Sequence, residues 1–367
     1  MNKEIITDKQ SIYLIIMFIV GTATILIRGI EAKQDLWLSI ILAVLMTLAV
    51  CLVFARLHYL FPHKDLFDIL EICFGKLIGK IIGLLYIWFA FHLNALILTY
   101  IDFVFTTVTF PETPGIAFNT LCVVIGTYAV KLGIEVLARW GKLFLHILVF
   151  IITIFVLLSI PEMKIANIRP TFSSEIGPII KGAFSAFSFP FAEIVIFTMV
   201  FNSFETRKSP YKIYTIGLLI SGVLLLILGM AYILVLGINT ASTQYFPAHL
   251  AASRISIGKL LQRAEAVVII LFSIGTFAKF CICLLATCIG ISKIFNFDEY
   301  RFIVVPISLL MLNLSYFLHE SVMGWLEWGI DIWPPFAFLL QAIFPIIILI
   351  VAEIKMRTLK NSLMQKF

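Results

Sequence analysis

One stretch inside a long apolar run carries residue types that could bind a small polar molecule. Residues 185–193 read S-A-F-S-F-P-F-A-E, in the apolar segment between Ile179 and Phe201. A proline inside a helix removes one N–H donor and displaces the carbonyl four residues earlier. In hydrocarbon, freed backbone groups are tolerated only where protein or a water-filled cavity covers them. We therefore expect S-F-P-F to break a helix beside a covered polar site, with a plain proline kink as the alternative.

Two charged residues lie near the middle of apolar segments. Glu193 follows the S-F-P-F stretch by two residues, and Lys279 lies in a later apolar run. A charged side chain at mid-membrane costs about 2.5–3.5 kcal/mol on the lenient insertion scale, so each is a functional candidate. Opposite charges at similar depth could bracket a zwitterion or form a structural ion pair that fixes helix packing. Both interpretations stay open, as does a proton site at Glu193.

The composition requires a bilayer as the solvent. Of 367 residues, 61% are hydrophobic and 13% are charged, and the mean hydropathy is +1.07. A soluble domain could not bury that share of apolar side chains. Lys and Arg gather at the N-terminus, in the loops after even-numbered segments and in the C-terminal tail, which predicts that both termini are cytoplasmic. This placement explains the net charge of +6, and no nucleic-acid partner is expected.

About ten apolar segments are long enough to cross the bilayer core as helices. They are approximately Ile12–Ile30, Trp37–Phe61, Ile81–Thr109, Ile116–Leu137, Leu143–Ile160, Ile179–Phe201, Ile213–Ile238, Ala264–Ile291, Phe302–Leu318 and Ile332–Val351. We therefore expect an all-α integral membrane protein with a single polytopic domain, residues 1–367. An even number of spans suggests two repeats, about 12–160 and 179–351, and residues 352–367 would form a cytoplasmic tail.

A pair of interrupted spans at matching positions of the two repeats indicates where such proteins bind ligands. V-G-T-A-T, Val20–Thr24, interrupts the first segment, and S-F-P-F, Ser188–Phe191, interrupts the sixth. These positions are equivalent if the repeats have five helices each. Half-helix N-termini suit a carboxylate and freed carbonyls suit an ammonium, so an amino acid fits such a gap.

The third segment supplies a further wall of the expected site. Phe89 and Leu93 share one helical face and could line an apolar pocket or simply pack against neighbouring helices. The predicted ligand-binding residues are Gly21, Thr22, Ala23, Thr24, Phe89, Leu93, Ser188, Phe189, Pro190, Phe191, Glu193, Ala278 and Lys279. The tryptophans near span ends, Trp37, Trp325, Trp328 and Trp333, are interpreted as interfacial anchors.

The sequence lacks the motifs of common catalytic and metal sites. G-x-S-x-G, H-E-x-x-H and the P-loop are absent, and the six cysteines form no C-x-x-C pair. We therefore expect no enzyme activity, no metal and no cofactor.

Several stretches, in their order and spacing, carry a family resemblance. They are A-K-Q-D-L-W (Ala32–Trp37), F-G-K-L-I-G-K-I-I-G-L-L-Y (Phe74–Tyr86), Y-A-V-K-L-G-I-E-V-L-A-R (Tyr128–Arg139), R-P-T-F (Arg169–Phe172), S-F-P-F-A-E (Ser188–Glu193), Q-R-A-E (Gln262–Glu265) and F-A-K-F (Phe277–Phe280). Over nearly its full length the chain resembles the spore germination permeases, the B-type subunits of germinant receptors in endospore-forming bacteria. The resemblance places it in the amino acid–polyamine–organocation superfamily and implies a LeuT-like five-plus-five inverted repeat with discontinuous helices 1 and 6.

The resemblance also implies partners and a function. It implies a receptor complex in the inner membrane of the spore, in which this chain joins an A-type membrane subunit and a C-type lipoprotein and recognises a small germinant, usually an amino acid. The alternatives are a proton-coupled amino acid or polyamine transporter and a non-binding membrane scaffold. By the same resemblance, the Lys279 ammonium stands in for a sodium ion between the first and eighth helices, so binding should not require sodium. Ile27 and Arg28 stand where many relatives have a proline.

Overall fold

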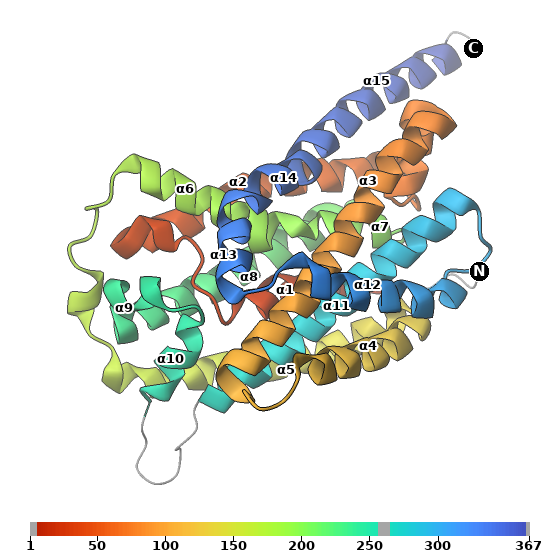
Figure 1. Cartoon of the computed structure of the whole chain (residues 1–367). Helices are drawn as coiled ribbons and strands as arrows, with labels where there is room; N and C mark the ends of the chain where they lie inside the picture. The colour runs from red at the N-terminus through yellow and green to blue at the C-terminus, as the bar shows by residue number, and fades with distance from the viewer. Residues whose placement is uncertain (1–5, 256–264, 365–367) are drawn as a thin grey trace.

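The computed structural model describes residues 6–255 and 265–364, and these residues form a bundle of helices (Figure 1). The helices are α1 (Asp8–Ala23), α2 (Leu36–Leu60), α3 (Leu66–Val104), α4 (Gly115–Lys131), α5 (Ile134–Ser159), α6 (Ile176–Ala186), α7 (Phe197–Val200), α8 (Ser209–Leu236), α9 (Ile238–Thr243), α10 (Pro247–Ser253), α11 (Glu265–Phe295), α12 (Val304–Leu318), α13 (Val322–Asp331), α14 (Trp333–Phe338) and α15 (Phe344–Met364). The end of α15 projects beyond the other helices in Figure 1. Of the Q-R-A-E stretch, Gln262–Ala264 lie outside the described residues, as do residues 365–367 of the predicted tail.

Eight helical stretches of the described chain are long and apolar enough to cross a membrane. They are Ile30–Leu60, Leu66–Thr109, Ile134–Glu162, Ile176–Val200, Ser209–Leu236, Glu265–Phe295, Arg301–Leu318 and Trp333–Thr358. The shorter helices α1 and α4 occupy the two remaining predicted segments, the first and the fourth. The predicted all-helical membrane architecture is therefore confirmed.

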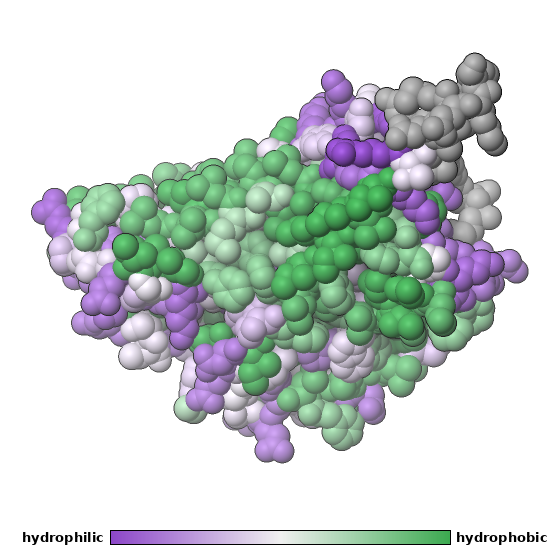
Figure 2. Space-filling view, turned by 90° about the horizontal axis from the view of Figure 1, so that it is seen from above, coloured by the Kyte–Doolittle hydropathy of each residue, from purple (hydrophilic) through white to green (hydrophobic). Residues whose placement is uncertain are grey.

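The outside of the bundle is apolar over much of its length. Figure 2 shows a broad hydrophobic area across the middle of one face, with hydrophilic groups gathered mostly toward its two ends. Large apolar side chains are exposed on the bundle: Leu121 of α4 is 59% exposed and Phe150 of α5 is 64% exposed. A contiguous apolar surface of this kind is suited to lipid rather than to water.

Helix α1 runs through the protein interior. Five of its apolar residues have no exposed surface at all, namely Ile15, Met17, Phe18, Ile19 and Val20. α1 crosses α11 at a pair of glycines, because a Cβ on Gly21 would lie only 2.2 Å from the carbonyl carbon of Gly275. The glycine in V-G-T-A-T thus permits close helix packing, and the packing holds α1 beside α11.

Several predicted boundaries were wrong: α3, for example, begins at Leu66 rather than near Ile81, and the errors in the fourth and fifth segments have a backbone cause. The fourth and fifth segments meet at Gly133, whose φ of +92° is readily reached only by glycine, so α4 ends at Lys131 and α5 already begins at Ile134. The first segment was expected to reach Ile30, but α1 ends at Ala23.

Candidate ligand-binding site

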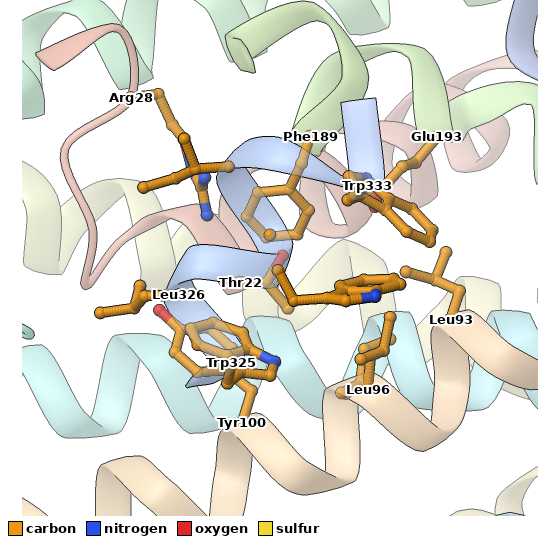
Figure 3. A pocket seen from close by; sticks show the side chains of 14 residues that line it. Thr22, Arg28, Leu93, Leu96, Tyr100, Phe189, Glu193, Trp325, Leu326 and Trp333 are labelled. Atoms are coloured by element: carbon orange, nitrogen blue, oxygen red, sulfur yellow. The ribbon is translucent and has the colours of Figure 1, made fainter. Parts of the chain in front are cut away.

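The sixth segment breaks where S-F-P-F predicts. α6 ends at Ala186, a wide π turn covers Phe187–Phe191, and a 3₁₀ turn over Ala192–Ile196 leads into α7. Within the wide turn, Phe189 has extended dihedrals, with φ of −145° and ψ of 119°. This excursion directs the Phe189 ring into the interior of the bundle, as Figure 3 shows.

The backbone carbonyl that this break leaves without a helical partner accepts hydrogen bonds from protein side chains. The Ser188 carbonyl accepts hydrogen bonds from Trp333 Nε1 at 3.2 Å and from Gln341 Nε2 at 2.9 Å. Both donors lie on the polypeptide around α14. The pairing satisfies a group that would be costly in hydrocarbon, so this carbonyl is not free to coordinate a ligand.

The first segment is also discontinuous, but its break begins at the end of V-G-T-A-T and continues past it. The chain leaves the helix at Thr24 and stays irregular until Gly29, whose φ of +75° turns it into a 3₁₀ helix at Ile30–Asp35. The Thr24 carbonyl accepts from the Tyr232 hydroxyl at 2.7 Å. The Ile25 carbonyl accepts from a backbone N–H of α10 at 3.4 Å. The discontinuities predicted in the first and sixth helices are thus both present.

Four predicted site residues from three segments meet at one point. Glu193 and Lys279 form an ion pair in which neither side chain has any exposed surface. Lys279 Nζ also donates to Thr22 Oγ1 at 3.1 Å and lies 4.5 Å from the centre of the Phe189 ring. Two opposite charges at mid-bundle neutralise one another, which fulfils the ion-pair interpretation. Glu193 Oε1 has no hydrogen-bond partner in the described part of the chain.

A narrow cavity of about 70 Å³ adjoins this ion pair. Four regions build its wall. They are the first segment (Thr22 and Arg28), α3 (Leu93, Leu96, Ile97 and Tyr100), the sixth segment (Phe189 and Glu193), and α13 with α14 (Trp325, Leu326, Trp328, Gly329, Ile330 and Trp333). Figure 3 shows Arg28 and Tyr100 on one side of the cavity and Glu193 on the other, with Phe189 between Arg28 and Glu193. Helix α13 therefore covers a site that α1, α3 and the sixth segment form.

The remaining predicted residues lie near the cavity without lining it. Phe89 stacks on Trp333, with ring centres 5.5 Å apart, and Gly21 packs against Gly275. The others, Ala23, Thr24, Ser188, Pro190, Phe191 and Ala278, are buried in the surrounding protein. Of the predicted set, the cavity is lined by Thr22, Leu93, Phe189 and Glu193, and Lys279 reaches it through Thr22 and Glu193.

Some lining residues were given another role from the sequence. Trp325, Trp328 and Trp333 were interpreted as interfacial anchors, and the structure places all three in the wall of the cavity, where Trp333 is only 3% exposed. The spacing of Trp325 and Trp328 is i, i+3, which places both rings on one face of α13 and was the available signal. Arg28 and Tyr100 had no pattern that marked them as lining residues.

A second cavity of about 410 Å³ touches the first at Trp328, which lines both. Half of its lining residues are polar or charged, namely His92, His319, Glu327 and Asp331. Burial lowers the pKa of His319, so its ring is uncharged at neutral pH. Glu327 and Asp331 then make this second cavity acidic, and the Trp328 side chain separates it from the narrow one.

Residues 5–321 match the sequence model of a family described as spore germination protein. The chain belongs to this family. Spore germination protein KB of Bacillus subtilis (strain 168) is 26% identical over 366 residues, which are 99% of this chain and 98% of that protein. Spore germination protein YndE of the same strain is 23% identical over 300 residues, 79% of this chain and 81% of that protein.

Solved transporters share the fold of this spore germination permease. Mhp1, a nucleobase-cation-symport-1 family transporter with bound bromovinylhydantoin, aligns with a TM-score of 0.65 at 11% identity, over 90% of this chain and 77% of that one. A mutant manganese transporter of Eremococcus coleocola aligns with a TM-score of 0.56 at 12% identity, over 93% of this chain and 77% of that one. The predicted LeuT-like fold class is confirmed by these likenesses.

Proposed function

We propose that this chain is the germinant-recognition subunit of a spore germinant receptor and binds a small molecule, an amino acid, in the narrow cavity. The observation that carries the proposal is the fully buried Glu193–Lys279 ion pair, whose Glu193 lines the cavity, at the meeting point of the first, sixth and eighth predicted segments. Ionisable groups inside a membrane are retained mostly where they serve a site. Membership in a spore germination family supplies the biological setting.

The small volume of the cavity and the position of α13 over it suggest how ligand binding could be signalled. A space of about 70 Å³ has room for few atoms beyond two or three water molecules, so a bound ligand requires the wall to move. Helix α13 is the part best suited to move, because none of its residues is fully buried. A ligand shifts a conformational equilibrium only by its difference in affinity between the states. Ligand bound beneath a displaced α13 would provide that difference.

The recipients of the signal would be an A-type membrane subunit and a C-type lipoprotein in the inner membrane of the spore. In this arrangement both termini face the cytoplasm, two repeats span about residues 12–160 and 179–351, and residues 352–367 form the tail. The full-length match to spore germination protein KB supports membership in such a receptor complex.

The second candidate function is proton-coupled transport of an amino acid or polyamine. It is favoured by the likeness of the fold to solved transporters and by the buried carboxylate of Glu193. The third candidate, a membrane scaffold, requires no ligand at all.

Proteoliposomes that contain this chain alone distinguish the three candidates. Radiolabelled amino acids are offered with and without a proton gradient, and both bound and internalised label are measured. Saturable binding without uptake is the expected result. Concentrative uptake driven by the gradient would replace the proposal with transport. The absence of both binding and uptake would favour the membrane scaffold.

A further inference from the structure

Arg28 brings a positive charge to the narrow cavity that no described residue neutralises. Its carboxylate neighbours within electrostatic range are Glu193 and Glu31, and the described chain contains no ion pair between Arg28 and either of them. Arg28 Nε is buried and has no hydrogen-bond partner among the described residues. A buried guanidinium donor without an acceptor is costly, and its presence at a cavity wall indicates an acceptor that comes from outside the chain.

The backbone holds Arg28 in this place. The irregular segment after α1 is fixed at its start by the Tyr232–Thr24 hydrogen bond and at its end by the left-handed turn at Gly29. A Cβ on Gly29 would also lie 3.0 Å from the Cβ of Ser39 on α2. Arg28 therefore projects from a constrained segment rather than from a free loop.

The contact that Arg28 does make leaves its hydrogen-bonding edge available. Its Cζ lies over the Phe189 ring, 3.9 Å from the ring centre. A cation–π contact satisfies no N–H donor, so the buried Nε–H of Arg28 stays available to an acceptor such as a carboxylate. The Tyr100 hydroxyl, on the same side of the cavity in Figure 3, is also buried without a partner in the described chain. Two unpaired donors thus border one space.

The charge balance of the site selects the kind of acceptor. Arg28 and Lys279 contribute two positive charges and Glu193 one negative charge, and Glu193 is already paired with Lys279. Arg28 is therefore the charged group of the cavity that has no ion-pair partner among the described residues, and a carboxylate on the ligand would supply one. A single arginine among Leu, Ile and Trp side chains suits one carboxylate better than a phosphate dianion. The free Oε1 of Glu193 across the cavity can accept from an ammonium group.

We propose that Arg28, assisted by the Tyr100 hydroxyl, binds the carboxylate of the ligand. The ligand is a zwitterionic amino acid with its ammonium toward Glu193 and an apolar side chain against Leu93 and Ile97 of α3. This proposal rests on the proposed function, and it adds the residues that select a carboxylate.

The test compares matched ligands on matched variants of the full-length protein in lipid nanodiscs. The probes are L-alanine, L-valine and L-leucine, each beside its amide and its decarboxylated amine, and binding is measured by titration calorimetry. In the wild-type protein we expect loss of the carboxylate to weaken binding about 10- to 100-fold, the usual range for a hydrogen bond to a charged group. Arg28→Gln should weaken binding of the amino acid by a similar factor and should bind amino acid and amide almost equally.

Two further variants separate recognition from folding. Arg28→Lys keeps the charge but loses the two-pronged edge, so part of the preference for the carboxylate should remain. Arg207→Gln removes an arginine that also lies over an aromatic ring, Tyr59, but outside the cavity, and should leave every affinity unchanged. Tyr100→Phe should weaken binding of the amino acid by about three- to tenfold, the effect of losing one hydrogen bond.

The outcomes distinguish this inference from the proposed function. Binding of the amino acid and its amide with equal affinity by the wild-type protein would overturn the role of Arg28 and leave the binding function intact. An undiminished carboxylate preference in Arg28→Gln would do the same. Absence of binding of all probes to the folded wild-type protein would instead count against the amino acid as ligand and hence against the proposed function.

Discussion

The two interrupted segments both pair the backbone carbonyls that a helix break exposes, but they differ in whether the charged residue beside the break is paired. In both segments, side chains donate hydrogen bonds to the freed backbone carbonyls. Tyr232 donates to the Thr24 carbonyl of the first segment. Trp333 and Gln341 donate to the Ser188 carbonyl of the sixth. The sixth segment, however, carries a charge that is already neutralised inside the protein. The first carries one that is not.

This difference assigns the two breaks different tasks. Glu193 after the sixth break pairs with Lys279, so its charge contributes first to the integrity of the bundle. Arg28 after the first break has an aromatic contact and a free edge. Loss of the charge pairing at the sixth break should therefore alter stability most, and loss of the Arg28 charge at the first break should alter binding most.

The largest effect is expected when the ion pair loses one partner. Lys279→Met leaves the Glu193 carboxylate buried without a counter-charge and should lower the free energy of unfolding by about 3–5 kcal/mol. The double variant Glu193→Gln with Lys279→Met removes both charges and should recover more than half of that loss. Unfolding in detergent, followed by circular dichroism, measures both. A single variant as stable as the double one would show that the pair is not the anchor of the sixth break.

Glu193→Gln tests the same break in its functional role. The amide keeps the size of the carboxylate and can still accept a hydrogen bond from Lys279, so the protein should remain folded and inserted in the membrane. The germinant response of spores that carry this variant should be impaired, because the ligand ammonium loses its charged partner. Spores are scored for germination and for the amount of the protein in the membrane. A normal response at normal protein level would remove Glu193 from the site.

Removal of the carbonyl partners compares the two breaks directly. Tyr232→Phe leaves the Thr24 carbonyl without its donor and should destabilise the protein by about 1–3 kcal/mol. Gln341→Leu should cost less, about 0.5–1.5 kcal/mol, because Trp333 still donates to the Ser188 carbonyl. Thermal unfolding of the two variants under one condition gives the order. The reverse order would mean that the second break depends on Gln341 more than the geometry indicates.

The smallest expected effect is that of sodium. The Lys279 ammonium already donates to Thr22 of α1 and to Glu193, so a cation occupies the junction of α1 and α11. Replacing sodium with choline should change ligand affinity less than twofold, within the scatter of a titration. A large loss of affinity in choline, with restoration by sodium, would show a separate ion site.

The fold could be predicted from the sequence largely because a bilayer imposes strong rules on length and polarity. The long apolar segments follow the length rule and can be recognised by it. The S-F-P-F break and the charged residues Glu193 and Lys279 depart from the polarity rule, and they can be recognised for that reason. The discontinuity of the first segment was anticipated, but its start at Thr24 depends on contacts with α8 and α10 that no local pattern contains. Gly21 was predicted to bind ligand, whereas the space around it is filled by Gly275.

The cover of the cavity was the least predictable part. Trp325 and Trp328 lie in a short helix between two spans, where tryptophan ordinarily marks the edge of the bilayer. Only the return of α13 over α3 and the sixth segment makes them part of the site. That return is a tertiary arrangement, and helical periodicity in one element does not encode it.

Helix α13 also bears on how ligand preference can diverge among related chains. It contributes several side chains to the cavity wall, yet none of its own residues is fully buried. Substitutions of residues that are not packed into a core usually change stability little. New side chains on α13 could therefore reshape the cavity for a different ligand while α1, α3 and α11 keep the bundle intact. Ligand preference can therefore change most easily through substitutions on α13 and least easily through substitutions of Glu193 or Lys279.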